Sequence, residues 1–240
     1  MIKNRLLTDL PKEELERLAP YLEPVQLEIK QHLLEMGEPI PYVWFPDDCV
    51  TSTVVNTSEG ATIEVGMMGI DGMVGLSLLF FEDISNTTVF VQVPGAATRM
   101  RADAFVKHVR DKGGPLFRQL QRYGNAFMAM VAQTAACNSL HSMDERLCRW
   151  ILVNHDRIGR DEFPMTHEFL SAMLGVRRAS VSVEAKRLQQ AGLIDYRRGQ
   201  MMIRDREGLE EGACECYGII NQLFARVFDG WPEMKKQKVR

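Results

Sequence analysis

The spacing of apolar residues changes near Arg101, and this change constrains the fold more than any other feature of the chain. Before Arg101, short apolar runs alternate with polar residues and are separated by turn-forming residues. After Arg101, apolar residues recur every three or four positions, which is the spacing of one face of an α-helix. Strands followed by helices predict an α+β protein.

The first hundred residues are expected to form one short helix and several antiparallel strands. The helix would run from Asp9 to Leu22, with Pro11 just inside its start. The expected strands cover residues 25–29, 43–45, 49–55, 61–67, 87–93 and 97–101. Residues 58–60 lie between two alternating runs, which is typical of a hairpin. Short strands with many turns between them predict an antiparallel sandwich or barrel.

A long helix is expected from Pro115 to about Leu140, after a first helix over residues 102–112 that ends at two glycines. The apolar residues of the long helix recur in alternating steps of four and three, as in helices that pair lengthwise. The expected dimer seam comprises Leu116, Leu120, Tyr123, Phe127, Met130, Thr134 and Cys137. The alternative is a core helix packed on its own domain.

Residues 143–204 predict a winged helix-turn-helix. A helix over 143–158 precedes two helices, 167–174 and 177–190, which Gly175 separates. A glycine there suits a tight turn with positive φ. Residues 196–204 predict a hairpin with Gly199 at its tip. In this arrangement the second helix enters the major groove of DNA and the hairpin contacts the backbone.

Basic residues gather at the start of the second helix and in the hairpin. Residues 166–206 hold eight lysines and arginines against four acidic residues, whereas residues 1–110 hold nine against sixteen. Arginine contacts guanine bidentately, and phosphates accept hydrogen bonds from basic and hydroxyl side chains. The predicted DNA-binding residues are Thr166, His167, Arg177, Arg178, Ser180, Ser182, Lys186, Arg187, Arg197 and Arg198. The alternative is a helical hairpin that only packs, with a solvated basic face.

Length and composition exclude several classes of protein. The 240 residues suffice for one large domain or two ordinary ones. No apolar run approaches the roughly 20 residues of a membrane-spanning helix, and residues 1–11 lack the apolar stretch of a secretory signal. Five irregularly spaced cysteines favour a reducing, cytoplasmic location. An enzyme is not expected, because no phosphate loop, nucleophile elbow or paired-histidine motif is present.

Cys214 and Cys216 form a Cys-x-Cys pair of the kind that binds metals or undergoes oxidation. A structural zinc site needs four ligands, and this pair supplies two. On the helix expected here, the two side chains would point about 200° apart. The interpretation is therefore that both are buried thiols, without a metal site.

Several short segments match a known family, in the right order along the chain. They are residues 37–39 (Gly-Glu-Pro), 43–46 (Val-Trp-Phe-Pro), 69–75, the long helix, 166–170 (Thr-His-Glu-Phe-Leu), 174–178 (Leu-Gly-Val-Arg-Arg) and 192–194 (Gly-Leu-Ile). With them the chain resembles the Crp/Fnr superfamily of bacterial transcription regulators. The resemblance implies a β-roll like that of cyclic-nucleotide-binding domains (1–112), a dimerisation helix (113–142) and a DNA-binding winged helix (143–240).

The β-roll departs from the family members that bind cyclic AMP. Those members carry a Glu where this chain has Met73 and an Arg shortly downstream, whereas residues 71–97 contain no lysine or arginine. A buried phosphate without a cation is costly, so cyclic AMP is not the expected effector. The expected effector pocket, if one is used, comprises Gly72, Met73, Val74, Gly75, Thr87, Thr88 and Phe127. The cysteine cluster of the oxygen-sensing branch is also missing, since the first cysteine is Cys49.

The resemblance implies a homodimeric regulator that binds double-stranded DNA and answers to an unidentified signal. RNA polymerase is a candidate partner. His32, His108 and His141 match the haem-binding branch in residue type only, so no cofactor is expected. The second helix carries Ala179 and Val183 where well-known members have Glu and Arg, which predicts a different target sequence. The alternative is a signalling module that acts on a protein partner without binding DNA.

Overall fold

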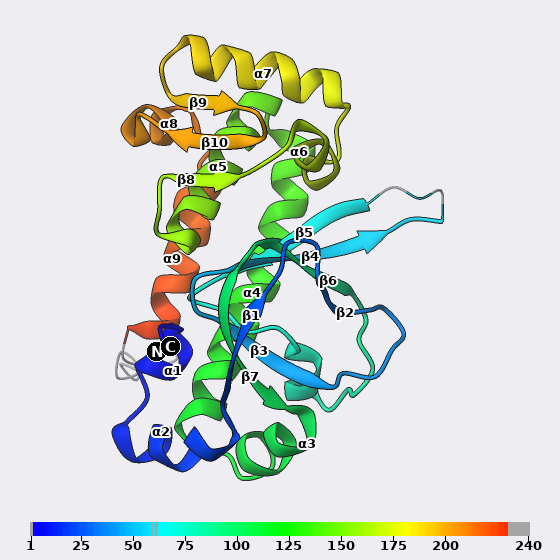
Figure 1. Cartoon of the computed structure of the whole chain (residues 1–240), viewed down its shortest axis with the longest axis vertical. Coiled ribbons are helices and arrows are strands. Elements are labelled where there is room, and N and C mark those ends of the chain that lie inside the picture. The colour runs from blue at the N-terminus through cyan, green and yellow to red at the C-terminus, as the bar shows by residue number, and fades with distance from the viewer. Residues whose placement is uncertain (1, 59, 61, 230–240) are drawn as a thin grey trace, which may run out of the picture.

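The computed structural model describes residues 2–58, 60 and 62–229. Figure 1 shows the β-roll and the helix-turn-helix segment at opposite ends of the molecule, with the long helix α4 between them. The order of strands followed by helices confirms the α+β class. Glu59 in the predicted turn, Ala61 at the start of a predicted strand, and residues 230–240 of the third predicted domain lie outside the described residues.

Two antiparallel sheets form the β-roll, with strand orders β1-β7-β3 and β2-β6-β4-β5. Their strands are β1 (Glu23–Leu27), β2 (His32–Leu34), β3 (Tyr42–Pro46), β4 (Val50–Asn56), β5 (Thr62–Met68), β6 (Thr88–Val93) and β7 (Gly95–Arg101). Six of them lie within two residues of the predicted strands. The seventh, β2, has three residues, and a bulge interrupts its pairing with β6, so it leaves no alternating pattern to detect.

The helix predicted from Asp9 to Leu22 is confirmed only in part, because a shorter helix and a 3-10 turn occupy that range and a further short helix precedes it. In chain order they are α1 (Arg5–Thr8), α2 (Lys12–Leu18) and a 3-10 turn (Ala19–Tyr21). Pro11 is the N-cap of α2 rather than a residue inside it. Pro20, in the 3-10 turn, lacks the N–H that a continuing α-helix needs.

The predicted long helix is confirmed as α4 (Pro115–Leu140). The helix before it is shorter than the predicted 102–112, because α3 (Ala102–Phe105) continues as a π-helix (Val106–Arg110). Gly114 joins the two elements with a φ of +113°, a conformation that side-chain-bearing residues rarely adopt.

The apolar stripe of α4 faces its own chain. The seam residues that are at most 2% exposed are Leu116, Leu120, Tyr123, Met130 and Cys137. Phe127 and Thr134 are half-buried. This burial revises the expectation that the stripe faces a second copy, and it fits the alternative of a helix packed on its own domain. A heptad pattern cannot separate the two cases, since it reports only which face is apolar.

The C-terminal part contains the predicted helices and hairpin. Its elements are α5 (Met143–Ile158), β8 (Glu162–Pro164), α6 (His167–Leu174), α7 (Arg178–Gln190), β9 (Ile194–Arg197), β10 (Gln200–Ile203), α8 (Arg206–Gly212) and α9 (Cys216–Phe228). The last helix, α9, returns along α4, and its residues Ile220, Phe224 and Val227 join the core of the β-roll. No helix among the described residues is both long enough and apolar enough to cross a membrane.

Candidate nucleic-acid interface

The turn between α6 and α7 depends on local capping. The Thr166 side chain caps α6 by accepting a hydrogen bond from the Phe169 N–H at 3.1 Å. Gly175 ends α6 with a φ of +64°, which a residue with a side chain would adopt only under strain. Arg177 is the N-cap of α7, so the helix begins one residue later than predicted. The exposed end of α7 therefore begins with two consecutive arginines.

His167 holds the two helices and the hairpin together. Its ring stacks on Tyr196 of β9 with centroids 4.3 Å apart, and its Nδ1 lies 3.0 Å from the Ser182 Oγ. Ser182 donates its own proton to the Arg178 carbonyl oxygen at 3.0 Å, so Nδ1–H is the donor to Ser182. Desolvation, assisted by the nearby Arg178 charge, lowers the pKa of His167 and favours a neutral ring. His167 and Ser182, both predicted to bind DNA, thus have partners within the chain.

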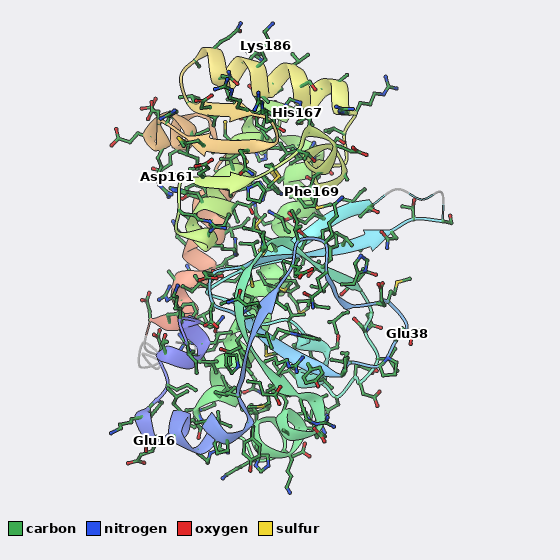
Figure 2. All side chains as sticks on the ribbon, viewed as in Figure 1. Glu16, Glu38, Asp161, His167, Phe169 and Lys186 are labelled. Carbon is green, nitrogen blue, oxygen red and sulfur yellow. The ribbon has the colours of Figure 1, made fainter. Side chains whose placement is uncertain are left out.

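The remaining predicted residues form an exposed basic surface on α7 and the hairpin. Figure 2 shows Lys186 projecting from the outer side of α7, away from the β-roll. Arg187 is paired with Glu184 at 2.9 Å. Among the residues predicted to bind DNA, the exposed cations that form no ion pair with any described residue are Arg177, Arg178, Lys186, Arg197 and Arg198. We call these five residues the basic surface. Val183 lies among them on α7 and is 57% exposed.

The hairpin is a two-residue turn between β9 and β10, with β8 as a third strand. Arg198 and Gly199 form the turn with φ values of +51° and +77°, as type I′ turns require. Glycine or asparagine is the usual residue at the position of Arg198. An arginine held in this less favourable conformation, at an exposed tip beside Arg197, points to a role that needs its charge.

Comparisons with known proteins agree with this geometry. Residues 145–211 match the family model of the Crp-like helix-turn-helix domain. These residues therefore form a Crp-like helix-turn-helix domain. No curated protein matches the sequence of the chain. A Crp-like helix-turn-helix domain is typical of DNA-binding transcription regulators rather than of enzymes.

Solved structures of Crp/Fnr regulators share the fold of about four fifths of this chain. FixK2 from Bradyrhizobium japonicum is 13% identical with a TM-score of 0.68, over 80% of this chain and 98% of that chain. TTHB099, a Crp-family regulator from Thermus thermophilus, is 17% identical with a TM-score of 0.65, over 79% and 96%. TTHA1359, a Crp/Fnr-family regulator from the same organism, is 18% identical with a TM-score of 0.62, over 80% and 98%. At these identities the likeness shows the fold alone.

Apolar contacts connect the β-roll to the Crp-like helix-turn-helix domain. Phe90 of β6 meets Phe169 of α6 edge-on, with ring centroids 6.0 Å apart. Gly175, at the turn itself, lies beside the Ile63 side chain of β5. A displacement of β5 or β6 would therefore act directly on the turn that orients α7.

Polar groups are buried at the same junction. The Trp150 indole of α5 donates to Glu64 Oε1 at 2.9 Å, and Gln92 donates to Asn154. Burial raises the pKa of Glu64 to about 7. The alternation of Ile63 and Val65 predicts that Glu64 faces solvent, but α5 covers this face of β5 and Glu64 is 6% exposed. Sequence reasoning missed these residues because they become neighbours only when α5 packs on the sheet.

The residues of the expected effector pocket divide between two places. Gly72 and Met73 lie against α4, where the Tyr123 hydroxyl donates to the Met73 carbonyl oxygen at 3.2 Å. Phe127 stacks beside Tyr123 and against Gly66. Val74 is paired with Trp44 across an isolated bridge, and Gly75 lies against Val43. In contrast, the Thr88 hydroxyl lies 3.4 Å from the Glu35 carboxylate, and Thr87 lies beside Ser85.

Proposed function

We propose that this regulator binds a near-palindromic DNA site as a homodimer, with α7 of each copy in the major groove and each hairpin on the flanking phosphates. The observation that supports this best is the basic surface, whose five cations have no acidic partner among the described residues. If this face were only solvated, ion pairs with neighbouring carboxylates would reduce the repulsion between its cations, as Glu184 does for Arg187. We place the protein in the cytoplasm, with RNA polymerase as a further partner.

The contact between copies would lie on the outward face of α4. The exposed residues there recur in steps of three and four: Asn125, Met128, Ala132, Ala135 and Ser139. Met128 is 64% exposed, and the two alanines would let a second helix approach closely. This face is opposite to the stripe that α4 buries in its own chain, so one helix can serve both contacts.

The regulatory signal would be something other than cyclic AMP. Met73 is fully buried, and residues 71–97 carry no cation to meet a phosphate. Glu35 places a carboxylate beside Thr88 instead, and this charge would repel a cyclic phosphate. Between β5, α4 and α5 there is a cavity of about 20 Å³ beside Glu64 and Trp150, which has room for a water molecule rather than a nucleotide.

Selection of bound fragments from genomic DNA tests the proposed function. The wild-type protein should enrich fragments that share one inverted repeat, and the double variant Arg177→Ala/Arg178→Ala should enrich none. Arg101→Ala is the matched control, because Arg101 is also exposed but lies on β7 of the β-roll. If the wild type enriches no sequence, the alternative of a β-roll module that acts on a protein partner replaces this proposal.

A further inference from the structure

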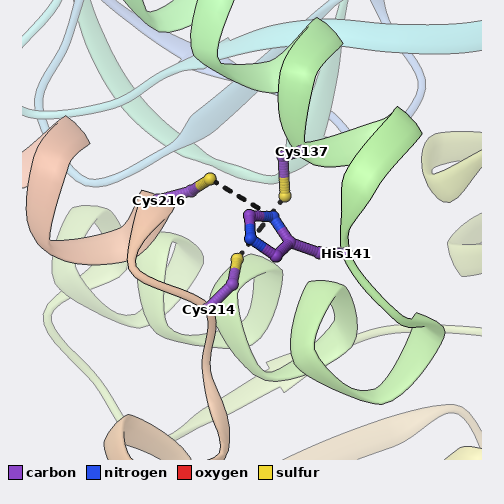
Figure 3. A group of neighbouring side chains, drawn as sticks. All are labelled: Cys137, His141, Cys214 and Cys216. Carbon is purple, nitrogen blue, oxygen red and sulfur yellow. Dashed lines mark hydrogen bonds between the residues drawn. The ribbon is translucent and has the colours of Figure 1, made fainter.

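Four potential metal ligands from two distant parts of the chain meet at the end of α4. Figure 3 shows Cys137 of α4 and His141, the C-cap of α4, facing Cys214 and Cys216 at the start of α9. Their ligand atoms all lie within 4.8 Å of one another. The Cys137 and Cys214 sulfurs are 3.5 Å apart, and the Cys216 sulfur is 3.5 Å from His141 Nδ1. We call these four residues the sulfur cluster.

The backbone explains how the Cys-x-Cys pair contributes both of its sulfurs. Cys214 precedes α9, after Ala213 in extended conformation, whereas Cys216 is the first residue of the helix. The expectation that both lie on one helix and point apart is therefore wrong. Cys137 lies in the last turn of α4, and His141 is the C-cap four residues later, whose N–H donates to the Cys137 carbonyl oxygen. Each pair thus directs two ligand atoms toward the same small space.

We infer that the sulfur cluster is a zinc site with three cysteine thiolates and His141 Nδ1 as ligands. Structural Zn²⁺ is four-coordinate and tetrahedral, and the set of three cysteines and one histidine is one of its standard ligand sets. With zinc–sulfur bonds of about 2.3 Å, tetrahedral geometry places ligand atoms about 3.7 Å apart. The two distances of 3.5 Å are close to this value. The inference does not depend on the proposed function.

The surroundings of His141 and Cys216 match those of metal ligands. His141 Nε2 lies 3.1 Å from Glu215 Oε2, which leaves Nδ1 to face the sulfurs. Ligating histidines commonly donate their second N–H to a carboxylate in this way. The Gln133 side chain donates to the Cys216 sulfur at 3.0 Å, a bond that is stronger to a thiolate than to a thiol.

Burial and charge also favour a bound cation. Cys137 and Cys216 are fully buried and Cys214 is 4% exposed. Three thiolates around Zn²⁺ carry one net negative charge. Arg146 and Arg149 of α5 are almost fully buried and interact electrostatically with the cluster's thiols, so they would balance that charge.

A zinc ion here would fasten the C-terminal segment to α4. Two ligands belong to the end of α4 and two to the link between α8 and α9. α8 packs on α5 next to the helix-turn-helix, whereas α9 packs on α4. Zinc would thus hold the α8–α9 link at the point where the β-roll core and the DNA-binding part meet, and its loss should lower the melting temperature.

Metal analysis of the untagged protein, purified without chelators, tests the inference. We expect one zinc per chain in the wild type and almost none in Cys214→Ala or His141→Ala. Cys49→Ala is the matched control, because Cys49 is also a fully buried free cysteine but lies in the β-roll. Reconstitution with Co²⁺ should give the visible absorption of tetrahedral cobalt thiolate in the wild type and in the control only.

Two measurements keep the test decisive if a variant does not fold. Titration of wild-type thiols with a mercurial, in the presence of a colorimetric zinc indicator, should release one zinc as the cluster's cysteines react. His141→Cys should retain zinc through four sulfurs. Zinc absent from the wild type, iron with sulfide in its place, or a Cys137–Cys214 disulfide in protein prepared under reducing conditions would each overturn the inference.

Discussion

Arg178 and Arg197 carry the same charge, but their positions predict different effects on DNA binding. Arg178 is in the first turn of α7, where side chains reach base edges, whereas Arg197 lies in the hairpin. Arg178→Ala should weaken binding to the selected site by about 1–3 kcal/mol and relax base choice at one position per half-site. Arg197→Ala should weaken all sequences alike and reduce the salt dependence. Fluorescence anisotropy at several salt concentrations measures both, and unchanged affinity in both variants would refute the placement of α7.

Val183 is an apolar residue that lies on α7 next to the basic surface. Its side chain is 57% exposed among the cations of α7, so it is available to an apolar group in the groove. The methyl group of thymine is the apolar feature of the major groove. We expect that replacing one thymine per half-site by deoxyuridine weakens wild-type binding by about 1 kcal/mol and that Val183→Ala removes this sensitivity. Equal binding of thymine and uracil sites by the wild type would show that Val183 contacts no base methyl.

At the scale of elements, the packing of α5 on β5 makes stability depend on pH. Glu64 is buried there beside Trp150, Arg149 and Arg157, and desolvation raises its pKa from 4.5 to about 7. The folded state therefore binds a proton more tightly than the unfolded state, so this group lowers stability as pH rises from about 4.5 to about 7. Glu64→Gln should gain stability over the wild type across that range, by on the order of 1–3 kcal/mol.

The measurement for Glu64 is urea unfolding of both proteins between about pH 5 and about pH 8. The difference between their unfolding free energies should grow toward pH 7 and then level off. Because only Glu64 differs between the two proteins, other titrating groups cancel. Parallel curves over the whole range would mean that Glu64 ionises as it does in the unfolded chain.

In the proposed dimer, the outward face of α4 forms the contact between the two copies. Ala132 is exposed on that face, so Ala132→Glu should leave the monomer folded while placing like charges against each other in the dimer. Sedimentation should show a monomer. DNA affinity should fall, because a monomer contacts only one half-site of the DNA. Ala19→Glu, at an exposed alanine of the β-roll, is the control. A dimeric Ala132→Glu protein would move the contact to another face.

Cyclic AMP should leave the whole molecule unchanged. A ligand that binds only the folded state stabilises it by about 2.7 kcal/mol at one hundred times its dissociation constant. The absence of a cation over residues 71–97 and the presence of Glu35 beside Thr88 remove the anchor for a phosphate. Millimolar cyclic AMP should therefore shift neither the melting temperature nor the DNA affinity. A rise of several degrees that Thr88→Ala abolishes would contradict this prediction.

Local signals in the sequence determined the elements of this protein. Gly175 and Thr166 predicted the bounds of α6, and Gly113 and Pro115 predicted the start of α4. Short apolar runs between turn residues predicted six strands of the β-roll. These signals suffice because capping, backbone freedom and burial of one face act within a few residues. The same signals placed Arg178 and Arg197 on the exposed surface. The local signals did not predict the helix bounds at Pro11 and Pro20. A proline is compatible with either the start or the end of a helix, and the packing of α1 and α2 selects between the two.

Contacts between distant segments were decided by the tertiary structure alone. The sequence predicted the apolar stripe of α4. Whether Leu120 and Tyr123 contact a second copy or their own β-roll depends on which elements of the chain pack against α4. Glu64 is buried because α5 covers β5, against the alternation of its own strand. Cys137 and Cys214 are 77 residues apart in sequence, and only the return of α9 along α4 brings their sulfurs together. Side-chain identity and spacing act over one or two turns of a helix, whereas a ligand set or a buried charge needs the fold that assembles it.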